Sequence, residues 1–410
     1  MIKLSVKEDC CGCGACLQRC PRHCIFFKED KEGFLYPLVD ESNCIDCGLC
    51  EKVCPVINRG ECNEPLYVYA VKNRNERIRL NSSSGGVFYS LGKYVIQKGG
   101  VVFGAAYDDK WEVRHQKAES MDTLEPLMRS KYVQSRIGNT FVEVETFLKQ
   151  GKLVLFTGTS CQILGLKNFL RHEYENLLTV DVICHGVPSP GVWRKFLMEL
   201  THLQSHKTAL CEVAGKNKKS VLLSSLESIS AITDINFREK EEYGWKKFGF
   251  VVLKKSVSKT DENSVLLSNI FSEDPYSRGF VNNLFMRPSC YACPAKGGTC
   301  GSDVTMADFW GIQKLYPDFD DDKGVSLAII HSLKGADIFN ACNFESMLVT
   351  LEEGTRFNQS YYHSMEMTSK RALFFADFIK GKKIRETVMR LTRRPVKMVV
   401  KQIIRKIICG

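Results

Sequence analysis

Apolar positions along the chain follow two spacings, which predict alternating strands and helices. Short apolar runs bounded by glycine or polar residues are typical of buried strands, and apolar residues three to four positions apart are typical of helices that pack by one face. The first spacing predicts strands at 24–27, 34–39, 67–72, 100–105, 153–156 and 178–183, with antiparallel strands around Phe237 and over 244–253. The second predicts helices at 86–96, 140–149, 163–170 and 190–200, and residues 157–162 are expected to form a turn. This order predicts a mixed α/β body with a β-rich insertion.

Two cysteine runs near the amino end repeat one spacing, C-x2-C-x2-C-x3-C-P. This is the spacing of bacterial ferredoxins that hold two 4Fe-4S clusters, in which the fourth cysteine of each run ligates the other cluster. The sequence therefore predicts two clusters, one held by Cys10, Cys13, Cys16 and Cys54 and the other by Cys44, Cys47, Cys50 and Cys20.

The residue types around these cysteines fit iron–sulfur chemistry. A cluster needs four soft thiolates, and Gly12, Gly14 and Gly48 lie between ligands, where a tightly bent backbone benefits from a residue that tolerates positive φ. The alternatives are zinc ribbons and disulfides. Zinc usually takes two CxxC pairs or histidine, so two triplet-plus-one runs fit it poorly.

Length, cysteine usage and charge indicate the number of domains, the cellular compartment and the location of the basic residues. A chain of 410 residues exceeds what one hydrophobic core usually supports, so two or three domains are expected. The sequence contains 19 cysteines, and it opens without a basic segment followed by an apolar one, so we expect a reducing cytoplasm. The net charge of +10 arises in residues 380–410, which contain eleven lysines and arginines and a single acidic residue, Glu386.

The basic tail has helical periodicity. Its apolar stripe consists of Val396, Val399, Val400, Ile403, Ile404, Ile407 and Ile408, and Lys397, Lys401 and Arg405 lie four apart on another face. Such a basic amphipathic helix suits an anionic surface, here the inner face of the membrane, or a partner's groove. The alternative is a terminal helix that packs on the body. Nucleic acid is not an expected partner, because no aromatic platforms accompany the charges.

Six motifs, in order, resemble the beta subunit of coenzyme F420-reducing hydrogenases and dehydrogenases. They are NSSSGG, RSKYVQS, VLFTGTSCQILGLKNFL, DVICHGVPSP, FREKEEYGWKKF and RPSCYACP followed by SDVTMADFWGI. With the cysteine runs, the resemblance covers about residues 1–330. It implies an iron–sulfur flavoprotein that binds FAD and exchanges electrons with a small soluble acceptor.

The predicted fold is therefore an α+β ferredoxin-like amino-terminal module, then a mixed α/β FAD-binding body with a β-rich insertion, then a C-terminal amphipathic helix. The expected segments are the two-cluster module at 1–62, two parts of the body at 63–152 and 153–330, a helical extension at 331–379 and the basic tail at 380–410.

A serine and glycine loop at 82–86 opens a predicted helix, where backbone N–H groups and the helix dipole favour a phosphate. Unaided, this pattern also fits an ordinary capped helix; the resemblance favours the FAD pyrophosphate. It implies that the cofactor is bound by Ser82, Ser83, Ser84, Gly85, Gly86, Ser130, Lys131, Tyr132, Thr157, Gly158 and Thr159.

The resemblance also favours a third 4Fe-4S cluster on Cys161, Cys184, Cys290 and Cys293. Cys161 and Cys184 each follow a predicted strand, and carboxyl ends of parallel strands collect ligands. Alternatively these two are small buried apolar residues, and the CxxC pair is a redox disulfide or half a zinc site. Cys300 could replace Cys161 or Cys184 as a ligand. The remaining cysteines are interpreted mostly as packing residues: Cys11, Cys24, Cys62, Cys211, Cys342 and Cys409.

Three residues are candidates for catalysis. Lys131 could stabilise negative charge that develops on a reduced flavin, His185 could donate a hydrogen bond to a cluster sulfur or the flavin, and Asp308 could transfer a proton. Each residue also has a purely structural interpretation. Lys131 would then be a solvated lysine and His185 a histidine with satisfied hydrogen bonds. Asp308 would form part of a pocket wall together with Asp303 and Trp310.

The leading hypothesis is a ferredoxin-linked, flavin-dependent oxidoreductase. It would relay electrons between its clusters and FAD, and to or from a small two-electron substrate, either F420-like or another acceptor. The expected partners are ferredoxin or another electron-carrying protein and the small redox substrate. The alternative is an electron-transfer adaptor that serves a partner enzyme, for example in surface-polysaccharide biosynthesis.

Overall fold

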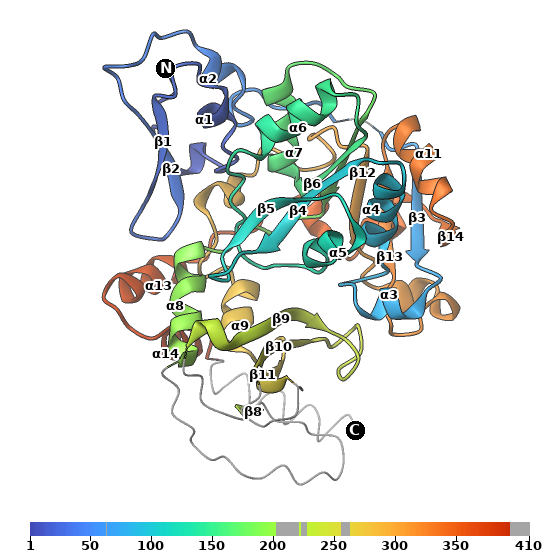
Figure 1. Ribbon diagram of the computed structural model, residues 1–410. Coiled ribbons are helices and arrows are strands. Elements are labelled where there is room, and N and C mark those ends of the chain that lie inside the picture. The colour runs from blue at the N-terminus through green and yellow to red at the C-terminus, as the bar shows by residue number, and fades with distance from the viewer. Residues whose placement is uncertain (63, 202–220, 223–227, 256–262, 394–410) are drawn as a thin grey trace.

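The computed structural model describes residues 1–62, 64–201, 221–222, 228–255 and 263–393. At the amino end, strands β1 (Ile25–Glu29) and β2 (Leu35–Val39) form an antiparallel hairpin beside the short helices α1 (Ala15–Arg19) and α2 (Leu49–Lys52). These elements stand together at one corner of the molecule (Figure 1). Gly14 and Gly48 precede the two helices with φ of 78° and 71°, and Gly12 has φ of 74°, which confirms the expected positive φ at all three glycines.

An eight-stranded sheet forms the centre of the body, in the order β14-β3-β13-β12-β7-β6-β4-β5. Strands β12, β7, β6 and β4 are mutually parallel, and the remaining pairs are antiparallel. The strands are β3 (Tyr67–Lys72), β4 (Val101–Tyr107), β5 (Val113–Ala118), β6 (Val154–Thr159), β7 (Leu177–Val182), β12 (Val304–Asp308), β13 (Ser326–Ile330) and β14 (Glu345–Leu348).

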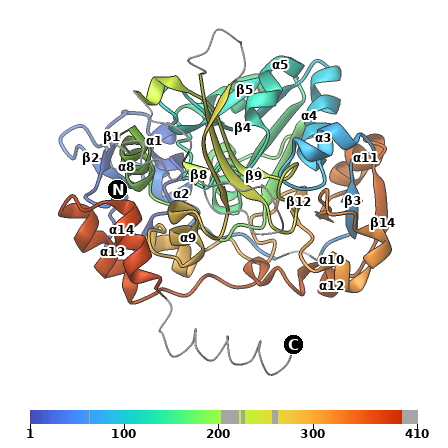
Figure 2. The ribbon, with the colours of Figure 1, turned by 90° about the horizontal axis from the view of Figure 1, so that it is seen from below.

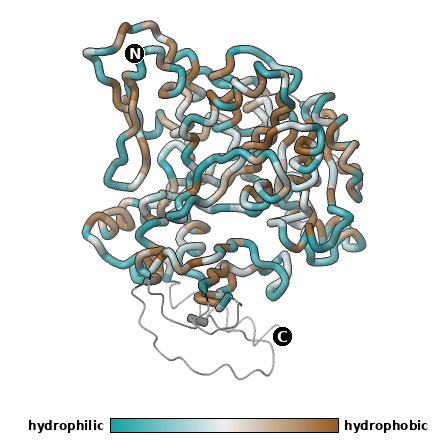
Figure 3. Tube along the Cα trace, viewed as in Figure 1, coloured by the Kyte–Doolittle hydropathy of each residue, from teal (hydrophilic) through white to brown (hydrophobic). Residues whose placement is uncertain are grey.

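Helices cover both faces of this sheet because alternate residues of its inner strands are apolar on both sides. Phe103 and Phe156 pack with α6 (Thr140–Lys149) and α7 (Ser160–Leu170) on one face. Val102 and Leu155 pack with α4 (Val87–Gln97), α5 (Met121–Leu124) and α11 (Leu333–Ala341) on the other. Apolar residues accordingly follow the inner strands, and polar residues gather on the outer loops (Figure 3).

The β-rich insertion is a separate antiparallel sheet in the order β8-β11-β10-β9. It lies below the central sheet in the view of Figure 1 and therefore faces the viewer in Figure 2, with helices beside it. The strands are β8 (Val221–Leu222), β9 (Ile232–Glu239), β10 (Gly249–Lys254) and β11 (Ser264–Ile270), and the helices are α8 (Pro190–Thr201), α9 (Pro275–Val281), α13 (Lys370–Ile379) and α14 (Ile384–Leu391). The remaining helices are α3 (Glu76–Leu80), α10 (Ile312–Leu315) and α12 (Leu351–Thr355).

Two expectations about local structure are wrong. Residues 157–162 form no turn, since β6 extends to Thr159 and α7 begins at Ser160. Thr159 and Gln162 form a capping box, so these polar residues end the strand and start the helix at once. The extension at 331–379 is not purely helical, because it contains β14, which pairs with β3 at the sheet edge. This strand has only four residues, so its sequence shows no clear alternation of apolar and polar positions.

The start of the basic tail packs on the body. Ile384, Val388 and Leu391 of α14 are buried in the core that α8 and α9 share. The predicted amphipathic helix beyond Pro395 lies outside the described residues. Among the described residues, none of the helices is both long enough and apolar enough to cross a membrane.

Candidate functional site

The two cysteine runs have different surroundings. Cys20 of the first run lines one small cavity together with Cys44, Cys47 and Cys50 of the second. Cys24 lies there too, with its sulfur 3.4 Å from that of Cys20. This outer cavity is near solvent, because Cys47 is exposed.

The remaining cysteines of the crossed assignment lie deeper. Cys13, Cys16 and Cys54 are buried, and Cys10 is half-buried. Burial, with Cys10 and Cys54 nearby, raises the pKa of Cys16 to about 12, so iron must displace a proton to bind there. Among the described residues, no three His, Cys, Asp or Glu side chains are arranged to hold a single metal ion.

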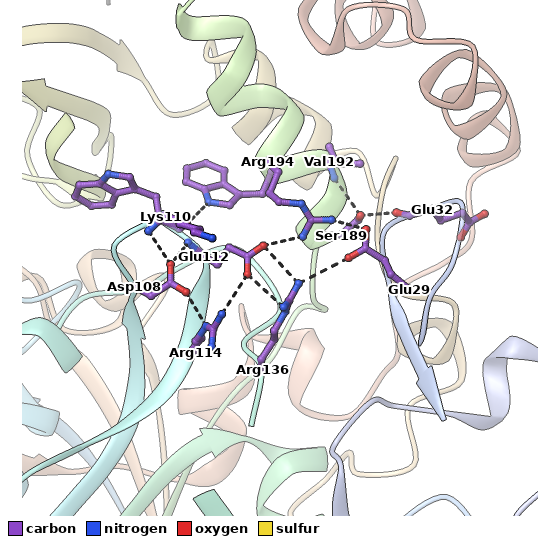
Figure 4. A network of polar contacts seen from close by, with 12 residues as sticks. Glu29, Glu32, Asp108, Lys110, Glu112, Arg114, Arg136, Ser189, Val192 and Arg194 are labelled. Atoms are coloured by element: carbon purple, nitrogen blue, oxygen red, sulfur yellow. Dashed lines mark hydrogen bonds and ion pairs between the residues drawn. The ribbon is translucent and has the colours of Figure 1, made fainter. Parts of the chain in front are cut away.

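Polar contacts fix the hairpin of the module to the body (Figure 4). Arg194 of α8 bonds to Glu29 of β1 and, at 2.9 Å, to Glu112, and Arg136 reaches both carboxylates. The Ser189 hydroxyl donates to the Glu32 carbonyl at the hairpin tip. The module is therefore attached through its inner side.

The four cysteines predicted for a third cluster line one cavity. Cys161 lies in the first turn of α7 and Cys184 follows β7, so both are at the carboxyl edge of adjacent parallel strands, as predicted. Cys290 lies in the 3-10 turn at 288–292, and Cys293 directly follows that turn. Cys11 of the ferredoxin module lines the same cavity.

The electrostatics of this cavity resemble those of the buried cysteines in the amino-terminal module. Burial raises the pKa of Cys290 to about 12, and a hydrogen bond with Cys11 together with burial raises that of Cys161 well above its usual value. Lys296 supplies positive charge nearby, where its ammonium donates to the Cys184 carbonyl at 2.7 Å. Cys300 is buried near Asp181 and is not among the described residues that line the cavity.

A second, larger cavity of about 670 Å³ adjoins the cysteine cavity, and Cys184 lines both. Its wall includes every residue predicted to bind the cofactor except Gly85, and also His185 and Asp308. Thr159, Ile183, Cys184, Val187 and Ser360 line both cavities. The cysteine cavity thus contacts the amino-terminal module through Cys11 and shares part of its wall with the large cavity.

The serine and glycine loop is held as a helix start. Gly86 adopts the left-handed conformation with φ of 86°, and none of the described side chains caps the N–H groups of α4. Ser82 and Ser84 donate their hydroxyls to backbone carbonyls, whereas Ser83 accepts from the Ser130 N–H at 2.7 Å. The N–H groups of α4, rather than the Ser82 and Ser84 hydroxyls, are thus the donors suited to an anion.

Two buried cations organise the cavity wall. Lys240 donates to the Ser84 carbonyl at 3.0 Å and to two further carbonyls, and burial lowers its pKa to about 7. Arg238 is 2 % exposed, pairs with both oxygens of Asp308 at 2.8 and 2.9 Å and lies 3.8 Å over the Phe248 ring. Its Nε is buried without a hydrogen-bond partner in the described part of the chain.

The three predicted catalytic residues all lie at this cavity, but each is already bonded. The Lys131 ammonium donates to the Pro126 and Met128 carbonyls, and burial lowers its pKa to about 7. His185 bonds to Asn283 at 2.7 Å, and burial lowers its pKa. Asp308 accepts from Trp245 at 2.8 Å in addition to its pair with Arg238.

Sequence reasoning missed the roles of Arg238, Lys240 and the buried His115, which lines the same cavity. The signal available was a pair of charged residues in and beside an apolar strand of the FREKEEYGWKKF motif. Their charges have buried partners, which spacing alone does not reveal.

Comparisons with known proteins agree with this architecture. Residues 9–58 match the 4Fe-4S dicluster domain, and residues 151–354 match the family described as the C terminus of the coenzyme F420 hydrogenase/dehydrogenase beta subunit. Together they define an iron–sulfur electron-transfer oxidoreductase. Through residues 151–354 the chain belongs to the F420 hydrogenase/dehydrogenase beta subunit family, which confirms the resemblance.

Two relatives are more distant or shorter. A protein named ferredoxin 7Fe, from Hydrogenibacillus schlegelii, is 42% identical over 53 residues, which are 12% of this chain and 62% of that ferredoxin, less than two thirds of its length. A chain of the F420-reducing [NiFe] hydrogenase complex from Methanosarcina barkeri, studied by xenon derivatization, aligns over 80% of this chain and 93% of its own at 14% identity. Its TM-score of 0.43 is too low to support an argument.

Proposed function

We propose that this iron–sulfur oxidoreductase is a flavoprotein, in which electrons pass between the ferredoxin-type clusters, a third cluster and FAD. The observation that carries the proposal is the shared wall of the two cavities. Cys184 belongs to both, and Cys11 joins the cysteine cavity to the ferredoxin module. This continuity would provide a path for electrons from the amino-terminal module to the large cavity.

The residues of the large cavity fit FAD. Its volume of about 670 Å³ is in the usual range for ligand pockets, roughly 300–1,000 Å³. The uncapped start of α4 suits a pyrophosphate, and the unpartnered Nε of Arg238 leaves a donor free at the wall. A flavin supplies the conversion between single electrons and the pair that a two-electron substrate needs.

Charged side chains would hold and orient the reactants. Lys131 places a partly charged ammonium at the wall, where it would stabilise negative charge on the cofactor side. Asp308, with both oxygens bonded to Arg238, is better suited to fixing that guanidinium than to moving a proton. Cys161, Cys184, Cys290 and Cys293 would ligate the third cluster, with Lys296 offsetting its charge.

Anaerobic purification after iron–sulfur reconstitution tests the proposal. We expect about twelve irons per chain, from three four-iron clusters, and one FAD, identified by its absorbance and mass. Cys293→Ala should lower the iron to about eight while FAD is retained, and the matched control Cys300→Ala should leave both counts unchanged. Wild-type protein with eight irons and no flavin would contradict the proposal.

A second candidate function is an adaptor that delivers electrons to a partner enzyme. The exposure of the outer run favours it, because Cys47 is exposed and Ile45 is 61 % exposed, as at a docking surface. Turnover separates the two candidates. A self-sufficient enzyme should reduce a deazaflavin, a nicotinamide or another soluble acceptor with reduced ferredoxin alone, whereas an adaptor should do so only with its partner present.

A further inference from the structure

Arg287 crosses the boundary between the body and the ferredoxin module. It precedes the turn that carries Cys290, and its side chain is 1 % exposed. Its guanidinium donates to the Cys10 carbonyl at 2.7 Å, the Leu35 carbonyl at 2.9 Å and the Gln134 side chain at 3.0 Å. A fourth contact, at 3.5 Å, reaches the Cys10 sulfur.

This buried cation has no carboxylate partner among the described residues. The anionic candidates that interact with it electrostatically include the Cys10, Cys11 and Cys290 sulfurs and the phenol of Tyr36, whose ring lies 4.4 Å away. Burial raises the pKa of Tyr36, so the phenol stays neutral. An unpaired charge is strongly unfavourable in a buried site, so sulfur is the group left to balance the charge of Arg287.

The backbone of the first run is shaped to admit this cation. Gln134 donates to the Cys11 carbonyl at 3.0 Å, so Gln134 and Arg287 together hold residues 10 and 11. A Cβ at Gly12 would lie 2.8 Å from the Gln134 amide and 2.9 Å from the Arg287 guanidinium. Glycine at this position lets the charge approach the sulfurs closely.

We propose that Arg287 raises the reduction potential of the inner cluster, the one assigned to Cys10, Cys13, Cys16 and Cys54, above that of the outer cluster. Reduction adds one electron to the inner cluster as the outer cluster loses one, and Arg287 stays protonated throughout. A nearby fixed cation stabilises the more negative, reduced form in a low-dielectric site. Electrons are thereby drawn inward, towards the body.

This inference needs only the two clusters of the module, so it stands or fails separately from the third cluster and FAD. Arg287→Gln in the full chain removes the charge and keeps a hydrogen-bonding side chain. Redox titration followed by EPR should show the inner one-electron equilibrium shifted roughly tenfold towards the oxidised form, about 59 mV more negative, with the outer potential unchanged. A protein that carries Cys47→Ala and Cys293→Ala, and so lacks one outer ligand and one ligand of the proposed third cluster, assigns the inner signal.

Two variants serve as controls. Arg287→Lys keeps the charge and should restore most of the potential, and Arg194→Gln removes an interface arginine that bonds to the carboxylates of Glu112 and Glu29, so it should move neither potential. Unchanged potentials in Arg287→Gln, or equal shifts of both clusters, would overturn the proposal. If Arg287→Gln does not assemble the inner cluster, Arg287→Lys decides: a loaded inner cluster near the wild-type potential supports the role of charge, and loss of the cluster there too refutes it.

Discussion

Equivalent positions in the two cysteine runs have opposite surroundings. Cys11 and Ile45 each follow the first cysteine of their run, yet Cys11 is 6 % exposed against the body and Ile45 is 61 % exposed. At the second cysteine, Cys13 is buried and Cys47 is exposed. One spacing therefore produces an inner and an outer site, and the body determines which is which.

The position between the first two cysteines shows how the difference arises. Gly12 and Asp46 both adopt positive φ, 74° and 49°. Asp46 faces solvent and pairs with the amino terminus at 2.7 Å, whereas the space beside Gly12 is filled by Gln134 and Arg287. The sign of φ is the same at both positions, and the contacts made from outside the run differ. The two copies of one cysteine spacing thus differ in burial and in contacts, because the body packs against this part of the first copy.

The largest expected contrast is in cluster survival. Brief anaerobic treatment with an iron chelator should remove the outer cluster, about four irons, while the inner cluster survives, because attack requires access to sulfur and iron. Iron release followed by absorbance and EPR should show two separate phases. Cys47→Ala should lack the fast phase; a single phase in the wild type would mean that the two sites are equally accessible.

Adding one methyl group to the inner run should break its docking. Gly12→Ala incurs strain at positive φ, roughly 1–2 kcal/mol, and overpacking against Gln134 and Arg287, roughly 1–3 kcal/mol. The apparent melting temperature should fall, and the inner cluster should be lost first. Gly48→Ala is the matched control, since it has φ of 71° and none of the described atoms lies within 4 Å of the added Cβ. Equal losses in both variants would show that φ, not the body, sets the requirement.

The cysteine runs and the strands can be predicted from the sequence because their signals are local. The cysteine spacing requires no knowledge of the fold, and the strand ends at Cys161 and Cys184 follow from short apolar runs. The individual strands β3, β6 and β7 lie where these runs predict them: β3 has the predicted bounds, and the bounds of β6 and β7 differ by one to three residues. The crossed assignment of Cys20 also follows from spacing, and the outer cavity brings it to the second run.

Contacts between distant segments are the part that spacing does not contain. Arg287 lies 277 positions from Cys10 and 153 from Gln134, so its place beside the inner run depends on the docked module. Cys11, which spacing groups with cysteines interpreted mostly as packing residues, is buried in the core and also lines the cysteine cavity. The error at 157–162 has a related cause, because polar residues that cap a helix resemble those of a turn.

The smallest expected effect is a pH dependence confined to the inner side. His115 donates to the Thr157 carbonyl and accepts from Ser135, beside the Gln134 that holds Cys11, and burial lowers its pKa to about 4. The unfolded chain keeps a histidine pKa near 6.5, so it binds the extra proton first as pH falls. Stability should therefore drop between pH 6.5 and 4, by roughly 2 kcal/mol at pH 5 relative to pH 7. The protonated ring would place a second donor against Ser135, which already accepts from Gln162 at 2.9 Å.

Urea unfolding of the wild type and of His115→Gln at both pH values measures this loss of stability. The variant should be less sensitive to acid by that amount, with the outer cluster unaffected in both proteins, and an equal slope would assign the acid sensitivity to other groups.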